Sequence, residues 1–409
     1  MTVKNLSKIP DVLGKISMRD LVIDPYGTLA AIRESSAAFA VESVGYRMWV
    51  ITRYDDVRRV LADPSVLRDL VEHRREINAH CMVRPMRKAH LPHDSRRSLF
   101  DRDGDDHHRL RALVGGAFTP ARLKELGSKV ERVAKELVET LPAGEPVDLV
   151  SRFAIPLAGT VGLQILGVSA GDRDELAAMS RAMIGSLDID EIERAAQGLF
   201  DYAKRLIAIK KVQPGDDLCT SLLRAHEDGQ MSADELASTY ILMIIASFEP
   251  ASSIGSGALA LLSHPDQLAR LITEPELFPA CVEEIVRYES PFRFVPPRYT
   301  AAPLQLDGVT IPAGELLLIS PAAANRDPAR FPSPDEFDMT RQTSGHLGFG
   351  HGTHRCLGAG LGRVQTAIAL RTLFQRFPHT SLAEPADQAH WQPGKFMRRL
   401  ADLPVILKD

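Results

Sequence analysis

The chain has 409 residues and a net charge of −4, from 49 lysines and arginines against 53 aspartates and glutamates. Hydrophobic residues make up 44% and charged residues 25%, a balance typical of a globular protein with a large core. This composition excludes a disordered chain, a collagen-like repeat and a strongly basic nucleic-acid-binding protein. Four cysteines are too few for a disulfide framework, which favours a reducing compartment.

The first ten residues lack the apolar core of a signal peptide. The longest apolar run, 241–248, is much shorter than the roughly 20 residues of a membrane helix. We therefore expect a cytoplasmic protein that binds neither a membrane nor nucleic acid.

The N-terminal part begins with a predicted hairpin over 39–52, followed by a helix over 54–62. Residues 72–102 differ from their surroundings, because they include eight Lys/Arg, four Asp/Glu and four His, with breakers at Pro85 and Pro92. This composition predicts a long, irregular, basic loop, and loops of that length are usually functional.

The middle of the chain, 122–211, shows helical apolar spacing with predicted breaks at Pro142, Pro156 and Gly171. Ser232 and Glu235 have the spacing of a capping box, which opens a long apolar helix ending near residue 264. At 1.5 Å per residue this helix would be about 45 Å long. A further helix is predicted between Pro279 and Pro291.

Strand patterns return at 304–306 and 309–311, joined by Asp307 and Gly308, a favoured hairpin turn. Residues 326–345 have the composition of a loop, and a final long helix is predicted from about Leu357. We expect one mainly α domain over 1–409 with a small β part, whose hairpins lie near 39–52 and 298–320.

The most informative segment is 348–358, where four glycines surround Cys356 just before the last helix. Glycines let the backbone approach a ligand closely, and a helix N-terminus stabilises a thiolate. A nucleophilic cysteine would need a base with an orienting partner, and a zinc site would need more ligands. For a nucleophile, His354 lacks an apparent orienting partner, and for a zinc site, Cys81, Cys219 and Cys281 are isolated in the sequence. A thiolate that binds a large prosthetic group needs neither a base nor further protein ligands.

This segment resembles the haem-binding loop of the cytochrome P450 family, Phe-x-x-Gly-x-x-x-Cys-x-Gly, which is matched at Phe349, Gly352, Cys356 and Gly358. Gly350 and His354 also agree with the family. The resemblance implies a P450 fold, a triangular prism of helices around one haem b. It implies that Cys356 is the axial thiolate ligand of the haem iron, and such a ligand favours O–O cleavage.

Supporting motifs occur in the family's order. Glu284 and Arg287 match the family's Glu-x-x-Arg pair, which implies a structural anchor for 325–337. The segment 103–111 resembles the family's approach to its third long helix, and His107 and Arg111 lie on one helix face. The resemblance implies that the two haem propionates are bound by four residues: His107, Arg111, Arg298 and His354.

The sequence departs from the family at 246–250, where the pattern is Ala-Gly-x-(Asp/Glu)-Thr. Ala246 and Glu249 match and are the expected catalytic positions together with Pro250, which replaces the threonine whose hydroxyl helps to deliver protons. Pro250 cannot donate to the Ala246 carbonyl, so we expect a kink that leaves this carbonyl free to hold water. Ser252 and Ser253 are distant substitutes for the hydroxyl.

With Pro250 in place of the family's threonine, three reactions are consistent with the sequence. The first is monooxygenation, in which a substrate hydroxyl or an ordered water replaces the missing alcohol and oxygen from O₂ is inserted into a small, mostly apolar substrate of secondary metabolism. The second is oxidative coupling, cyclisation or desaturation without oxygen insertion. The third is a peroxide-driven peroxygenase, disfavoured because Glu249 would repel a substrate carboxylate. A competing class is a haem sensor without turnover.

By family position, substrate contacts come from the loop before His107, from 245–250, from 291–297 and from 395–397. The candidate apolar contacts are Ile245, Phe248, Phe292, Phe294, Val295, Phe396 and Met397. In the basic loop, Arg84, Arg87 and Lys88 are candidates for an anionic group on the substrate.

The resemblance covers nearly the whole chain, so we expect no fused reductase. It implies a monomer that receives electrons from a separate ferredoxin and ferredoxin reductase, or oxidant from peroxide. Basic residues are then expected where an acidic ferredoxin docks, with Arg109 and Arg355 as candidates.

Overall fold

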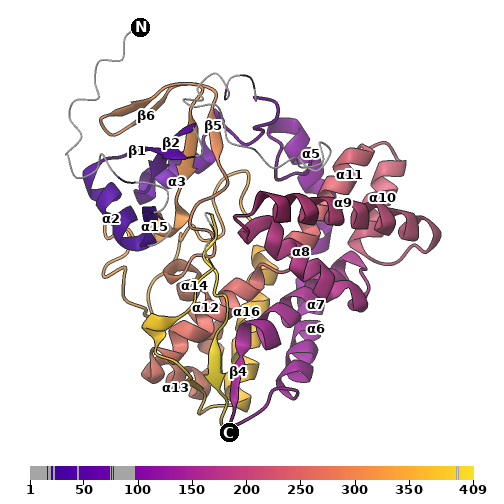
Figure 1. Ribbon diagram of the computed structural model, residues 1–409, viewed down its shortest axis with the longest axis vertical. Coiled ribbons are helices and arrows are strands. Elements are labelled where there is room, and N and C mark those ends of the chain that lie inside the picture. Colours follow the sequence, from indigo (N-terminus) through magenta and orange to yellow (C-terminus); the bar gives the residue numbers. More distant parts are fainter. Residues whose placement is uncertain are drawn as a thin grey trace.

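The computed structural model describes residues 16, 20–21, 24–43, 46–73, 75, 77, 97–392, 394 and 396–409. Figure 1 shows a body of helices with small sheets beside it, so the predicted mainly α fold is confirmed. The basic loop falls mostly on 78–96, and Arg84, Arg87 and Lys88 lie outside the described residues.

The helices of the first half include the predicted helix over 54–62, which is confirmed as α3. They are α2 (Pro25–Ser35), α3 (Tyr54–Ala62), α5 (Gly104–Gly115), α6 (Pro120–Val138), α7 (Ile155–Leu166), α8 (Arg173–Gly185), α9 (Ile189–Val212) and α10 (Leu218–Glu227). Those of the second half are α11 (Ala233–Ala246), α12 (Pro250–Leu262), α13 (Pro265–Thr273), α14 (Phe278–Tyr288), α15 (Pro321–Asn325) and α16 (Ala359–Arg376). Short 3₁₀ turns occupy Gly116–Phe118, Ala170–Asp172, Pro275–Leu277 and Ala386–Gln388.

Within the described residues the strands form three small sheets. The largest has the order β1-β2-β8-β5-β3, built from β1 (Phe39–Ser43), β2 (Tyr46–Ile51), β8 (Leu316–Ile319), β5 (Arg298–Thr300) and β3 (Val66–Leu67). The second has the order β4-β10-β9, from β4 (Pro146–Asp148), β10 (Pro404–Ile406) and β9 (Ser381–Leu382), and the third pairs β6 (Leu304–Leu306) with β7 (Val309–Ile311). Both predicted hairpins, β1-β2 and β6-β7, are confirmed.

The helices pack around two large hydrophobic clusters. One joins α6, α7, α12, α14 and α16, and the other joins α7, α9, α10 and α11. Among the described residues one helical stretch, Ala233–Leu262, is long and apolar enough to cross a membrane, and it contributes to both clusters. Its apolar character is therefore explained by packing.

The predicted long helix is interrupted at 247–249. Its capping box at Ser232 is present, but α11 ends at Ala246 and α12 begins at Pro250. The expectation of a free Ala246 carbonyl is wrong, because this oxygen accepts a 3.2 Å hydrogen bond from the Glu249 amide. The chain tightens into i→i+3 turns, which satisfy the carbonyl that Pro250 leaves without its usual donor.

The break is matched by two glycines of α7. A Cβ atom at Gly162 would lie 2.8 Å from the Cα atom of Ser247 and closer still to its side chain. A Cβ atom at Gly159 would overlap the ring of Phe248. The serine that replaces the family's glycine is therefore accommodated by a glycine on the neighbouring helix.

The predicted break at Pro156 is wrong. A π turn over Val150–Ala154 runs directly into α7, and Pro156 occupies the first turn of that helix. Proline is tolerated there because the first amides of a helix have no intrahelical acceptor.

Gly162→Ala tests the close contact between Gly162 of α7 and Ser247 at the break in the long helix. The added methyl group has no space beside Ser247, so we expect the free energy of unfolding to fall by about 1–3 kcal/mol in urea denaturation. Gly127→Ala in α6 is the control, because its Cβ atom meets only Val364 at 3.8 Å. It should be neutral or stabilising by up to about 1 kcal/mol. Equal losses in both variants would contradict the tight contact.

Candidate functional site

The loop before α16 presents Cys356 in a defined turn. Gly350 and Gly352 both have φ of 72°, a conformation that only glycine adopts easily. The Cys356 amide donates a 2.8 Å hydrogen bond to the Phe349 carbonyl and closes the loop. Gly352 also lacks space for a side chain, because its Cβ atom would lie 2.9 Å from the Cα atom of Ala62.

Cys356 precedes the N-cap of α16, Gly358, by two residues. Its side chain is exposed, yet protein atoms surround it closely, and this desolvation raises the pKa of the thiol. The Gly358 amide and the Arg111 guanidinium oppose this shift because both favour the thiolate. By contrast, Cys219 and Cys281 are fully buried, and burial raises the pKa of the Cys281 thiol to about 12.

Beside this loop, the N-terminus of α5 contributes to a cluster of cationic and donor groups. Asp103 accepts hydrogen bonds from the Arg68 and Asp69 amides at 2.6 and 2.8 Å and lies 3.2 Å from Nε2 of His354. Arg111 donates a 2.8 Å hydrogen bond to the Arg355 carbonyl. These contacts join α5 to the cysteine loop.

His107 and Arg298 are the least satisfied members of this cluster. His107 is fully buried with its ring 4.3 Å from that of His354, and neither ring nitrogen has a hydrogen-bond partner among the described residues. Burial, then repulsion from His354 and Arg111, lower its pKa to about 4. Burial and Arg68 lower the pKa of Arg298 to about 9, and its buried Nε likewise lacks a partner within the described ranges.

These residues fit the haem that the resemblance implies. Among the described residues Asp103 is the carboxylate that acts on both Arg298 and His354, and the two propionates of a haem would add acceptor oxygens and two negative charges. Ala246 and Cys356 are both exposed although the helices next to them are packed into the core, as expected for atoms that a prosthetic group covers. His107, Arg298, Arg111 and His354 would therefore hold its propionates.

Glu284 and Arg287 form a fully buried ion pair in α14. Arg287 donates to both carboxylate oxygens at 2.6 and 2.8 Å and to the carbonyls of Asn325, Pro334 and Glu336. Glu284 Oε1 also accepts hydrogen bonds from the Asp338 amide and from Arg341. The pair thus holds the whole segment 325–341.

Asn325 connects the Glu284–Arg287 pair to the cysteine loop. Its Oδ1 accepts a 2.6 Å hydrogen bond from the Leu347 amide, and its Nδ2 donates to Ser290. Leu347 in turn accepts a 2.8 Å bond from the Gly350 amide. A continuous chain of hydrogen bonds therefore runs from α14 to the turn that carries Cys356.

At the break in the long helix, Glu249 forms an ion pair with Arg399. Arg399 also contacts the sulfur of Met397 at 3.7 Å. The predicted substrate contacts in this part of the chain end at residue 397, so Arg399 was not predicted. An arginine near the C-terminus has no local sequence pattern that links it to residue 249.

The candidate substrate contacts fall into two groups. The segments 292–294 and 396–397 pair with each other, because Phe396 accepts hydrogen bonds from the Arg293 and Phe294 amides at 2.8 and 3.2 Å and Phe292 forms a β-bridge with Met397. Phe292, Val295, Phe396 and Ile245 are partly buried, whereas Phe294 and Met397 are buried. Phe248 packs instead against Gly159, which favours a role in the core over the predicted one in the pocket.

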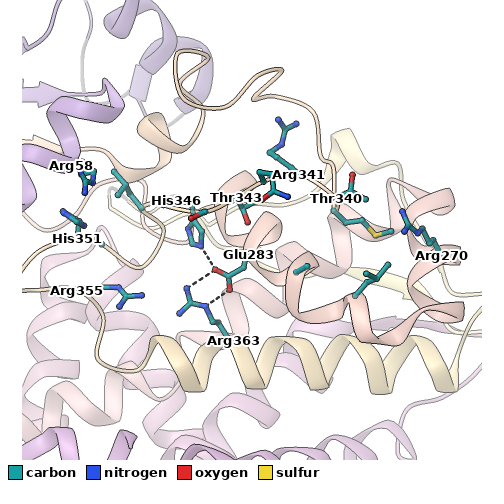
Figure 2. Close-up of a pocket in the computed structure, with 18 residues that line it drawn as sticks. Arg58, Arg270, Glu283, Thr340, Arg341, Thr343, His346, His351, Arg355 and Arg363 are labelled. Carbon is teal, nitrogen blue, oxygen red and sulfur yellow. Dashed lines mark hydrogen bonds and ion pairs between the residues drawn. The ribbon is translucent and has the colours of Figure 1, made fainter. Parts of the chain in front are cut away.

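A groove of about 830 Å³ lies on the outer side of the cysteine loop, and Figure 2 shows its lining. Arg58, His351 and Arg355 lie at one end, and neither arginine side chain has an ion pair or hydrogen bond with the described residues. Burial first, then these two arginines, lower the pKa of His351. In the middle, Glu283 is bonded to His346 and Arg363.

The two arginines expected to meet a redox partner differ in their surroundings. Arg109 pairs with Asp106 and with Glu235 of the capping box, at 2.8 and 2.7 Å. Arg355 has no such pair in the described structure and lines the groove. Of the two predicted arginines, Arg355 is therefore the one without an ion pair in the described structure. Arg58, which the sequence analysis did not predict, lies beside it in the groove and also has none.

Comparison with known proteins agrees with this geometry. The cytochrome P450 family model matches residues 185–399. Cytochrome P450 107B1 of Saccharopolyspora erythraea is 38% identical over 384 residues, which cover 93% of this chain and 95% of the relative. The chain therefore belongs to the cytochrome P450 family.

Two solved structures extend the match. The tirandamycin C-bound P450 monooxygenase TamI has a TM-score of 0.89 at 32% identity, covering 96% of this chain and all of that one. CxnD, a P450 for C–S bond formation in chuangxinmycin biosynthesis, has a TM-score of 0.87 at 32% identity, covering 95% of each chain. The protein is a cytochrome P450 oxidoreductase of the monooxygenase type, and its family implies a haem iron.

Arg287→Lys tests the anchor formed by Glu284 and Arg287. Lysine keeps the charge but loses the planar fork that serves Glu284 and three carbonyls, so we expect unfolding to become easier by roughly 3 kcal/mol. Urea denaturation followed by the haem absorbance measures this loss. The same exchange at exposed Arg132, paired with Glu136, should change stability by less than about 0.5 kcal/mol. A similarly small effect at Arg287 would contradict its role as an anchor.

Proposed function

We propose that this protein is a haem-thiolate monooxygenase that inserts oxygen from O₂ into a small, mostly apolar organic substrate of secondary metabolism. The observation that carries the proposal is a set of buried nitrogens at His107 and Arg298, beside the loop of Cys356, that have no hydrogen-bond partner among the described residues. Haem b, bound there, supplies the redox chemistry that activates dioxygen. We further propose that the chain acts as one monomeric domain in the cytoplasm.

In this proposal the residues around Cys356 hold the cofactor. Cys356 provides the thiolate, and the Gly358 amide, which favours the charged sulfur, tunes its basicity. His107 and Arg298 satisfy their buried nitrogens on the propionates. Arg111, fixed on the Arg355 carbonyl, and His354, fixed on Asp103, complete the set.

On the substrate side, Ala246, Glu249 and Pro250 are the proposed catalytic positions. Ala246 is exposed and small, so it would leave room for a cofactor and a substrate. Glu249 is the carboxylate that holds or moves a proton at this point, and Arg399 fixes its orientation. Pro250 supplies no hydroxyl.

The pocket is proposed to be mainly apolar and aromatic. Its proposed lining consists of Ile245, Phe292, Phe294, Val295, Phe396 and Met397, with Arg84 and Arg87 from the basic loop as contacts for an anionic group. The monooxygenase TamI, which matches this fold closely, supports oxygen insertion as the reaction.

Oxidative coupling is the second candidate, and one observation favours it. Pro250 removes the hydroxyl that helps to deliver protons, and the similar P450 CxnD acts in C–S bond formation. Peroxygenase activity ranks third, because Glu249 would repel a carboxylate substrate.

Carbon monoxide and product mass test this function together. The reduced protein with carbon monoxide should absorb near 450 nm, as expected for a thiolate ligand, and Cys356→Ser should lose that band. Turnover of apolar natural products should add about 16 mass units, the mass of one oxygen atom. A product lighter by about 2 mass units would instead identify coupling or desaturation. Absence of the band near 450 nm in the wild-type protein would exclude a haem-thiolate enzyme.

We also propose that an acidic ferredoxin, reduced by a ferredoxin reductase, docks at the end of the groove formed by Arg58, His351 and Arg355 (Figure 2). Two guanidinium groups without an ion pair in the described structure create a local positive potential beside the cysteine loop. Such a surface attracts an acidic partner and raises the association rate.

Neutralising single arginines tests this docking surface. Arg58→Gln and Arg355→Gln should each raise the KM for an acidic [2Fe–2S] ferredoxin at least about threefold, with a weaker dependence on salt. Arg270→Gln, at the other end of the groove, is the control because Glu274 already pairs with it at 3.0 Å. Steady-state reduction rates measure all three, and equal effects in the control would place the partner elsewhere.

A further inference from the structure

Two grooves meet at His351 beside the cysteine loop. The groove of about 830 Å³ adjoins a second groove of about 560 Å³, which is lined by α3, by the two residues after it and by His351. Arg58 and His351 line both grooves, so they stand where the two meet. Figure 2 shows Arg58 above His351 and Arg355 below it. The histidine ring is therefore accessible from either groove.

The charge at this junction is positive and unpaired. Arg58 on α3 and Arg355 on the cysteine loop are both exposed, and neither side chain has an ion pair or hydrogen bond with the described residues. His351 is half-buried and also has no such partner in the described part of the chain. An anionic group can therefore approach all three side chains without displacing an existing partner.

The remaining charged groups of the two grooves have partners, with one exception among the described residues. The pairs are Arg59 with Asp56, Glu283 with His346 and Arg363, Arg341 with Glu284, and Arg270 with Glu274. Asp63 accepts hydrogen bonds from the amide and the hydroxyl of Ser65. The exception is Asp55, but the charges that act on His351 are those of Arg58 and Arg355. The surroundings of His351 therefore disfavour its protonation.

An acidic partner would reverse this situation. In the free protein burial, then repulsion from Arg58 and Arg355, lower the pKa of His351 below its usual value of 6.5. A carboxylate between the two arginines would neutralise their repulsion, and its own negative charge would favour the imidazolium. The pKa of His351 is then higher in the complex than in the free protein, so the histidine binds a proton from solvent as the partner docks.

We propose that His351 binds the acidic redox partner as an imidazolium and takes up a proton when carboxylates of the partner settle between Arg58 and Arg355. This inference rests on the proposed docking of a ferredoxin and adds its regulation by pH. Binding that takes up a proton becomes tighter as the pH falls. The gain is complete below the pKa of His351 in the free protein and is lost as the pH rises through its pKa in the complex.

Calorimetric titration of the haem-loaded enzyme with an acidic [2Fe–2S] ferredoxin tests this coupling. Titrations near pH 7 in phosphate and in Tris, whose ionisation enthalpies differ, count the protons that are taken up on binding. We expect about 0.3 to 1 proton per complex, and binding about threefold to tenfold tighter near pH 6 than near pH 8. Because the ferredoxin also carries titratable groups, variants of His351 assign the effect.

Two substitutions of His351 should have different signatures. His351→Gln cannot be charged, so it should weaken binding about threefold to tenfold near pH 6, change it little near pH 8 and abolish most of the proton uptake. His351→Lys is charged throughout, so near pH 8 it should bind about as tightly as the wild-type protein does near pH 6, without that uptake. A role of His351 in shape alone would weaken binding equally at both pH values.

His390→Gln is the matched control. His390 is exposed, pairs with Asp402 at 3.2 Å and lines neither groove, so this variant should keep the wild-type pH dependence. A further measurement needs no partner protein. Arg58→Gln removes one source of repulsion, so the pKa of His351 in the free protein should rise, which the NMR signal of its ring in the carbon monoxide complex reports.

The coupling is refuted if His351→Gln keeps the proton uptake and pH dependence of the wild-type protein, or if Arg58→Gln leaves the pKa of His351 unchanged. The proposed docking surface fails in a different way, with Arg58→Gln and Arg355→Gln binding ferredoxin as tightly as the wild-type protein, and the coupling then falls with it. Each variant is first checked for the carbon monoxide band near 450 nm, which shows that its haem site is intact.

Discussion

The buried ion pair of Glu284 and Arg287 is the constraint on which the position of the cysteine loop depends. Two charges without access to water are stable only if every donor and acceptor is used, and here the partners come from 325–341. The same requirement fixes Asn325, which bonds to Leu347 at the base of the loop. A charge pair that does no chemistry therefore determines where Cys356 lies.

Around the loop the opposite situation holds, since hydrogen-bonding nitrogens of the described residues are left without partners. In the part of the chain that the structure describes, buried nitrogens of His107 and Arg298 have no hydrogen-bond partner, and burial lowers the pKa of each residue. Such groups favour whichever bound molecule brings negative charge into the site. Polar groups that anchor the cysteine loop thus have hydrogen-bond partners within the described structure, whereas polar groups expected to bind a cofactor do not.

Local patterns in the sequence predicted the elements that depend on neighbouring residues. The hairpin turn at Asp307 and Gly308, the capping box at Ser232 and the helix over 54–62 are all confirmed. Local patterns gave wrong predictions at two prolines. Pro156 does not break the chain, because a π turn runs directly into the helix that contains it, and the Ala246 carbonyl is not left free by Pro250, because it accepts a hydrogen bond from the Glu249 amide. The partner of Glu249 was missed because Arg399 is 150 residues away and marked by no motif.

Pro250 changes the chemistry of the long helix more than its shape. It occupies the first turn of α12, where proline costs little because the amide it lacks would have no acceptor in that helix. The break itself is accommodated by Gly159 and Gly162 of α7 and by the i→i+3 bonds of 247–249. Compared with the family's threonine, the proline lacks both an amide N–H and a hydroxyl, and the i→i+3 bonds of 247–249 compensate only for the N–H. Backbone geometry and proton chemistry are therefore separable in this helix.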